Sequence, residues 1–135
     1  METERFRSRY TETTKGIRIS VIPEAIEQQS DAASSVYTFA YTITVENLGE
    51  AAAQLIERHW LIFSGDQQIA EVVGPGVVGM QPRISPGEAF QYQSSAVIQD
   101  PIGAMHGSYT FRTDDGELFE VSIPKFDLVY SYLMH

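Results

Sequence analysis

The fold class of this chain is decided by the stretch Val36-Tyr37-Thr38-Phe39-Ala40-Tyr41-Thr42-Ile43-Thr44-Val45-Glu46. Apolar side chains occupy every second position from Tyr37 to Val45, and the positions between them are threonine or alanine. A period of two is typical of a β-strand with one buried face. The stretch therefore predicts a half-buried strand.

Similar stretches follow one another along the chain. They predict strands over residues 17–23, 54–63, 68–73, 88–98, 105–111 and 119–123, and a loop with at most one helical turn over 24–35. The first and last strands are expected to stop at Pro23 and Pro124, because proline donates no ladder hydrogen bond. About seven strands at roughly ten-residue spacing, with no amphipathic helix between them, predict an all-β fold, an antiparallel β-sandwich of about seven or more strands. Trp60 fits the buried tryptophan of an immunoglobulin-like third strand.

The chain is predicted to hold one domain with two flanking segments. Residues 1–15 are polar and lack a usable period, so they are interpreted as a mobile N-terminal arm or a loosely attached edge segment. Residues 16–125 form the predicted sandwich. Residues 126–135 are an apolar C-terminal tail, which would pack on the sheet, add an edge strand or join two copies of the chain.

Composition excludes several classes of function. The chain of 135 residues has no cysteine, which excludes a disulfide framework and a thiolate metal site. It has no apolar run of the roughly 20 residues that a membrane-spanning helix needs, and no apolar signal region, so a cytoplasmic protein without a membrane span is expected. The net charge is −9, and residues 1–18 carry +2 (5 − 3), which leaves −11 on the remainder. Such an acidic body predicts no nucleic-acid partner and suits basic protein surfaces or small cations better.

A glycine pattern at residues 74–79 raises the question of a nucleotide. Gly74, Gly76 and Gly79 have the G-x-G-x-x-G spacing that cradles pyrophosphate in dinucleotide-binding folds. That use requires a helix directly after the glycines, and Pro82 and Pro86 exclude one. Two interpretations remain: the glycines supply positive φ and close backbone approach in a loop, or their amides form an anion nest. The candidate binding loop comprises Gly74, Gly76, Gly79, Gln81, Pro82 and Arg83.

Few other residues suggest chemistry. Glu57 and His59 lie two apart on one strand face and form a weak candidate pair of cation ligands, without a third ligand to complete a metal site. No serine has a visible link to a histidine, and no phosphate-binding lysine motif is present. The sequence therefore predicts neither an enzyme nor a resident cofactor.

Several ordered segments together resemble the ApaG family. They are 37–47, 58–60, 71–82, 86–94 and 103–111, and the resemblance covers about residues 16–125. It implies a fibronectin type III-like sandwich. Similar domains in eukaryotic F-box proteins and in a DNA polymerase delta-interacting protein are taken to mediate protein contacts. The bacterial proteins, historically called CorD, are associated with cobalt resistance and magnesium efflux, and their glycine motif has prompted proposals of pyrophosphate binding.

Two functional hypotheses follow. The first is a non-enzymatic protein-interaction module whose partner is unidentified, with a homodimer through the tail or a sheet edge left open. The alternative is a small-ligand or divalent-cation-linked regulator that binds an anion or pyrophosphate at the 74–79 loop.

Overall fold

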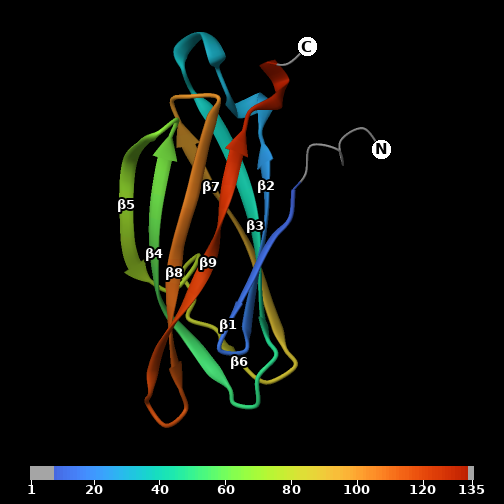
Figure 1. Cartoon of the computed structure of the whole chain (residues 1–135), viewed down its shortest axis with the longest axis vertical. Coiled ribbons are helices and arrows are strands. Elements are labelled where there is room, and N and C mark those ends of the chain that lie inside the picture. The colour runs from blue at the N-terminus through green and yellow to red at the C-terminus, as the bar shows by residue number, and fades with distance from the viewer. Residues whose placement is uncertain (1–7, 134–135) are drawn as a thin grey trace.

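Two antiparallel β-sheets pack face to face in the computed structural model, which describes residues 8–133 (Figure 1). One sheet has the strand order β1-β2-β3-β7 and the other β5-β4-β8-β9, with β6 paired to β4. The strands are β1 (Tyr10–Thr14), β2 (Ile17–Ala25), β3 (Tyr37–Asn47), β4 (Ala53–Ser64), β5 (Gln67–Pro75), β6 (Arg83–Ile84), β7 (Ala89–Ile98), β8 (Ile102–Thr113) and β9 (Leu118–Val129). Short 3-10 helices cover Glu27–Gln29 (η2), Ala32–Ser34 (η3) and Ser131–Leu133 (η4). Within residues 8–133, no helix has the length and apolar character needed to cross a membrane.

The strand order confirms the predicted sandwich. In an immunoglobulin constant domain, strands A, B, E and D form one sheet and C, F and G the other. Here β2, β3 and β7 take the places of A, B and E, and β4, β8 and β9 take those of C, F and G. The remaining strand β5 stays beside β4 instead of crossing to β7. This arrangement is that of a fibronectin type III-like domain.

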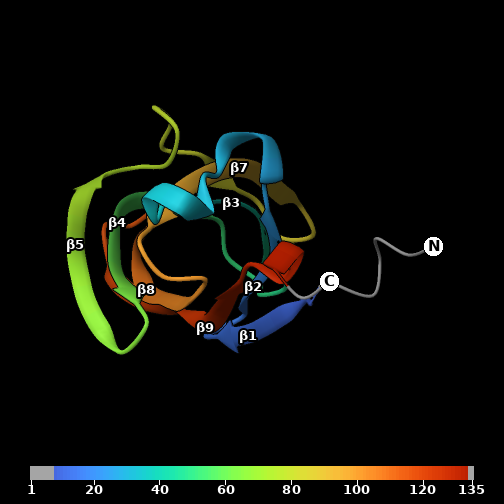
Figure 2. The same cartoon turned by 90° about the horizontal axis from the view of Figure 1, so that it is seen from above.

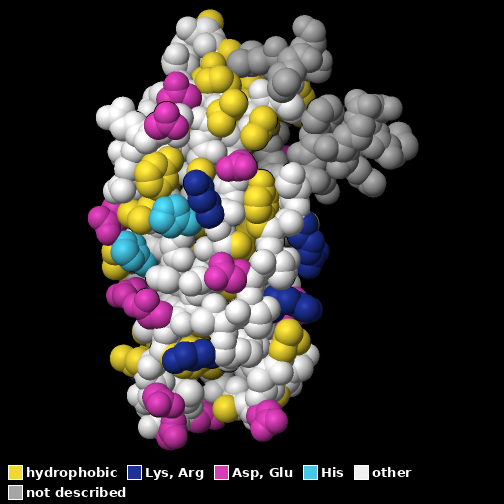
Figure 3. Space-filling view, viewed as in Figure 1, with side chains coloured by type: hydrophobic (Ala, Val, Ile, Leu, Met, Phe, Trp, Pro, Cys, Tyr) yellow, Lys and Arg dark blue, Asp and Glu magenta, His cyan; other side chains and the backbone are white. Residues whose placement is uncertain are grey.

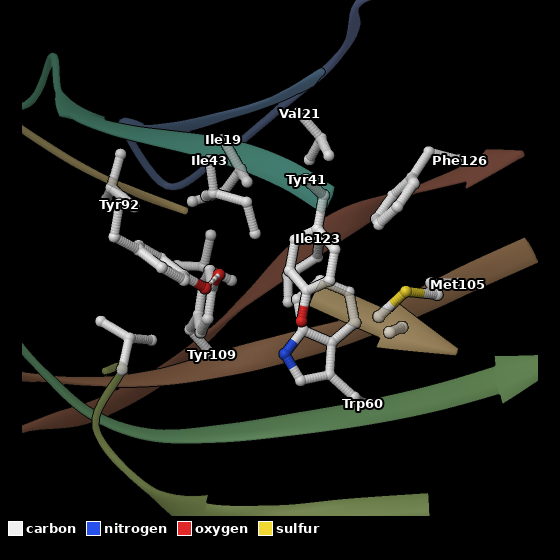
Figure 4. Packing of buried hydrophobic residues seen from close by; sticks show 14 of the residues in the cluster. Ile19, Val21, Tyr41, Ile43, Trp60, Tyr92, Met105, Tyr109, Ile123 and Phe126 are labelled. Atoms are coloured by element: carbon white, nitrogen blue, oxygen red, sulfur yellow. Dashed lines mark hydrogen bonds between the residues drawn. The ribbon is translucent and has the colours of Figure 1, made fainter. Parts of the chain in front are cut away.

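Aromatic side chains fill the space between the sheets. The apolar row of β3 faces inward as predicted, and Trp60 from β4 is only 3% exposed. The Trp60 ring meets Phe126 edge to face, with centroids 5.9 Å apart, and also contacts Tyr41 (Figure 4). Edge-to-face pairs of this kind add about 0.5–1.5 kcal/mol to the stabilisation from burial.

One side of the sandwich is closed by the N-terminal strand. Viewed from above, β1 lies beside β9 of the other sheet (Figure 2). The Tyr10 ring packs against Phe126, and the Ser122 amide donates to the Thr14 hydroxyl oxygen at 3.3 Å. From Tyr10 onward, the predicted arm is therefore an edge strand, the second of the two alternatives. Residues 1–7 of that arm lie outside the described residues.

Both prolines that were expected to end strands lie inside them. Pro23 pairs with Tyr41 on β3, beyond the point where β1 stops opposite Val21, so its missing N–H falls on a free stretch of edge. Pro124 lies in the register shift between Met105 and Gly107 of the β8–β9 pair, where a bulge removes the need for a ladder donor.

The apolar tail begins as part of the sheet. β9 continues to Val129, so the sandwich extends past the boundary expected at residue 125. Phe126, Leu128 and Tyr130 are all buried in the core. Residues 126–130 thus pack on their own sheet, and residues 134–135 lie outside the described part of the chain.

Candidate functional site

The side of the sandwich opposite β1 and β9 is open and contains a cleft. Its walls come from the two edge strands, β5 of one sheet and β7 of the other. The loop at residues 74–79, called the glycine loop below, covers one part of the cleft. The cleft has a volume of about 330 Å³. Residues that line it include Arg58, Trp60, Val72, Val77, Tyr92 and Ser94. The predicted loop therefore borders a real cavity, but only its Val77–Gly79 part lines the wall.

Arg58 is the cationic group of this cleft. It lies on the inward-facing row of β4 with Trp60, and its Nη1 atom donates to the carbonyl oxygens of Pro75 and Gly76 at 2.9 and 3.0 Å. Gly74 leaves room for it, because a Cβ atom there would lie 3.1–3.2 Å from the guanidinium group. Within residues 8–133, Arg58 forms no ion pair with a carboxylate. The cleft thus holds a positioned positive charge that no acidic side chain of the described residues neutralises.

The glycine loop closes as a tight turn. Val77 and Met80 exchange backbone hydrogen bonds, each of 2.8 Å, around Val78 and Gly79, which both have positive φ. The Gly76 amide donates to the Ile56 carbonyl oxygen at 2.8 Å. Three amides that an anion nest would use are therefore already bonded to carbonyl groups. The structure supports the interpretation in which the glycines serve backbone geometry.

The other residues of the candidate loop anchor it. The Gln81 side chain donates to the Ile56 carbonyl oxygen at 2.9 Å, and the Pro82 carbonyl oxygen accepts from the Leu55 amide at 2.9 Å. Arg83 points elsewhere, with Nε 2.9 Å from the Asp114 carboxylate, and this contact lowers the pKa of Asp114. Gln81, Pro82 and Arg83 are thus structural contacts in this arrangement.

Tyr41 and Tyr92 line the cleft, and the Tyr92 hydroxyl group meets that of Tyr109 in the core behind it. The Tyr92 and Tyr109 hydroxyl oxygens lie 2.5 Å apart across the two sheets (Figure 4). Burial raises the pKa of both groups well above the usual value for tyrosine. Burial also raises the pKa of Tyr41, whereas a hydrogen bond with Ser94 and the charge of Arg58 act in the opposite direction. These side chains are neutral hydrogen-bonding groups at neutral pH.

The two weak cation candidates lie on the outer face, away from the cleft. His59 Nε2 is 2.7 Å from the Glu71 carboxylate on β5, so the structure pairs His59 with Glu71 and not with Glu57. In the part of the chain that is described, no three His, Cys, Asp or Glu side chains are grouped to hold a metal ion. Acidic side chains are spread over this face, with histidines near its left side (Figure 3).

Sequence reasoning missed the residues that make the cleft chemically distinctive. Arg58 has the same strand parity as the buried Trp60, and an arginine on a buried row is a signal that could have identified it. Tyr41 and Tyr92 look like ordinary core residues in the sequence. Their convergence depends on how the two sheets face each other.

Comparison with known proteins places the chain in a family. The family model described as the ApaG domain matches residues 27–113. Protein ApaG of Thiobacillus denitrificans is 48% identical over 119 residues, covering 88% of this chain and 94% of that protein. The corresponding protein of Salmonella arizonae is 49% identical over 110 residues, covering 82% and 88%. A crystal structure named for the ApaA protein of Bordetella pertussis has a TM-score of 0.81 and 43% identity, covering 84% of this chain and 92% of that one. The chain belongs to the ApaG family.

Proposed function

We propose that this protein is a non-enzymatic interaction module that binds a protein partner at the cleft between β5 and β7. The cleft carries the proposal, because in the described part of the chain it combines apolar lining side chains with an arginine that forms no ion pair, between the free edges of β5 and β7. A few convergent polar groups among apolar lining side chains are the usual composition of a binding pocket. The described cleft residues also supply no nucleophile and base pair, which favours binding over catalysis.

The rim of the cleft supports contact with a macromolecule. Val78 is 53% exposed at the tip of the glycine loop, and Met80 is similarly exposed nearby. Exposed apolar side chains around a hollow are typical of protein contact sites. The tight turn holds Val78 out from the sandwich without requiring a flexible loop.

The test is capture of partners by the full-length protein. A Val78→Asp variant places a charge on the rim, whereas Leu118→Asp makes the same change at a 61% exposed position on the β8–β9 hairpin. We expect partners that bind the wild type and the Leu118→Asp control, and that the Val78→Asp variant fails to retain. Partners that bind all three proteins equally would contradict a role for the cleft.

The association with cobalt resistance and magnesium efflux is proposed to act through that partner. Residues 8–133 offer no three-ligand cluster, so direct cation sensing lacks structural support. We expect a strain lacking the gene to become cobalt-sensitive, and Val78→Asp to restore resistance less well than Leu118→Asp. Equal rescue by both variants would separate the cation phenotype from the cleft.

A further inference from the structure

The free edge of β7 is an open template for another strand. Over its ten residues β7 pairs with β3 in continuous register and, within the described part of the chain, has no strand on its other side. It contains no charged residue, no proline and no glycine. Natural edge strands usually carry such features or a bulge to prevent pairing. The β5 edge has them, in Glu71, Gly74 and Pro75. Of the two edges beside the cleft, β7 alone is unprotected.

The register identifies which backbone groups of β7 are available. Asn47 of β3 donates to the Glu88 carbonyl oxygen, whereas the Thr38 carbonyl oxygen accepts from Ile26 on the opposite side. Because strand residues alternate between neighbours, odd-numbered residues of β3 bond toward β7. Thr42 and Ala40 bond the other way, and their partners Gln93 and Ser95 direct their N–H and C=O groups to the free edge.

The position beside β7 corresponds to strand D of an immunoglobulin constant domain. This chain keeps β5 beside β4, so the D position is vacant within residues 8–133. A strand added there would lie over the mouth of the cleft. Every second side chain of that strand would then point toward Trp60, Val72 and Arg58.

We propose that β7 binds an extended segment of a partner protein by strand addition, and that an acidic side chain of this segment pairs with Arg58. This inference rests on the proposed function and specifies the partner's chemistry. Charge complementarity selects the occupant, because Arg58 has carbonyl contacts but no carboxylate within the described residues. Its charge also reaches Tyr41 and Tyr92 of the opposite sheet, next to where the added strand would lie. Main-chain pairing supplies affinity in such complexes, and side-chain pockets supply specificity.

A proline at either free edge provides a matched test. Gln93→Pro removes an outward N–H from β7 and obstructs that edge. Val73→Pro does the same on β5, where the Gly76–Ile56 hydrogen bond sets the alternation and Val73 faces away from β4. Both changes are tolerated in principle, because proline is accepted where an edge N–H faces solvent. Circular dichroism and thermal melting of both variants check that the fold is retained.

The probe is a library of random linear peptides as long as the ten residues of β7, selected on the full-length wild-type protein. We expect enriched peptides in which every second position, on the face toward the cleft, is apolar or acidic. Gln93→Pro should weaken their binding at least about tenfold, as expected for losing strand hydrogen bonds, and Val73→Pro should leave it unchanged. Selection on Arg58→Gln should enrich peptides without the acidic preference.

Several outcomes would overturn the inference. These are an absence of enriched peptides, equal binding to Gln93→Pro, or an acidic preference that persists in Arg58→Gln. A wild-type dimer that Gln93→Pro converts to monomer would assign the edge to a second copy of the chain instead. If captured partners depend on Val78 but not on Gln93, the cleft functions without strand addition, and the proposed function survives the failure of this inference.

Discussion

Gly76 and Gly79 belong to one sequence motif but meet different constraints in the folded chain. Both have positive φ. A Cβ atom on Gly76 would lie 2.1 Å from the Met80 carbonyl oxygen, whereas one on Gly79 would meet nothing within 4 Å. Gly76 is thus required because its surroundings leave no room for a side chain, whereas Gly79 is required only because its backbone is left-handed.

Alanine substitutions should separate these two roles. We expect Gly76→Ala to lower the free energy of unfolding by about 3 kcal/mol, because the turn must open as well as adopt a strained φ. Gly79→Ala adds only the backbone strain, about 1 kcal/mol. Urea denaturation of both variants measures the difference. Equal losses would mean that the close approach to Met80 does not constrain the loop.

Among the elements, the β3–β4 connection is held by one buried side chain. Asn47 at the end of β3 is 1% exposed. Its amide group donates to the carbonyl oxygens of Ala51 and Ile84, both at 2.9 Å, and its oxygen accepts from the Gly49 amide. Through Ile84 it links the turn to β6 and so to the end of the glycine loop.

Removing that side chain should weaken the whole connection. Asn47→Ala removes the three side-chain hydrogen bonds of a buried residue, including the buried bond to the Ile84 carbonyl oxygen, and we expect a loss of about 2–4 kcal/mol in the free energy of unfolding. Asn47→Asp keeps the shape but replaces the donor with an oxygen, so it should not restore stability. Thermal and urea denaturation give the measurement, and a wild-type melting curve for Asn47→Asp would show that the two donated bonds contribute nothing.

The composition of residues 126–135 did not decide whether this tail packs on its own sheet, and the end of β9 now allows a test. Phe126 is fully buried against Trp60, Tyr41 and Tyr10, whereas Val129 is 47% exposed. We expect Phe126→Ala to cost about 3–5 kcal/mol and Val129→Ala to cost well under about 1 kcal/mol. If both changes are mild in chemical denaturation, the tail does not contribute to the core as the structure has it.

At the scale of the whole molecule, the sequence predicted the sandwich because each strand carries its own period. The alternation of Tyr37, Phe39 and Tyr41 is local information and survives without knowledge of the partner strand. The prediction that two strands end at proline was wrong. The sheet tolerates Pro23 because it lies on a free edge, and Pro124 because it lies at a bulge, and neither feature can be read from the strand's own sequence. The cleft was only partly predictable for the same reason: Gly74 and Arg58 are 16 positions apart, and only the β4–β5 pairing brings them together.

The pair of tyrosine hydroxyl groups between the sheets makes the stability of the molecule sensitive to alkaline pH. Tyr109 is fully buried and Tyr92 nearly so, and burial raises both pKa values above the value of about 10 expected in the unfolded chain. Above pH 10 the unfolded state therefore binds fewer protons than the folded state, and the free energy of unfolding falls as pH rises. Below pH 10 these groups do not make the free energy of unfolding depend on pH.

Urea denaturation between pH 8 and 11 should show a decline in the free energy of unfolding that is absent or smaller in a Tyr92→Phe/Tyr109→Phe double variant. The double variant removes both partners together, so neither hydroxyl group is left buried alone. Identical pH profiles for the two proteins would mean that the hydroxyl pair ionises as freely in the folded chain as in the unfolded one.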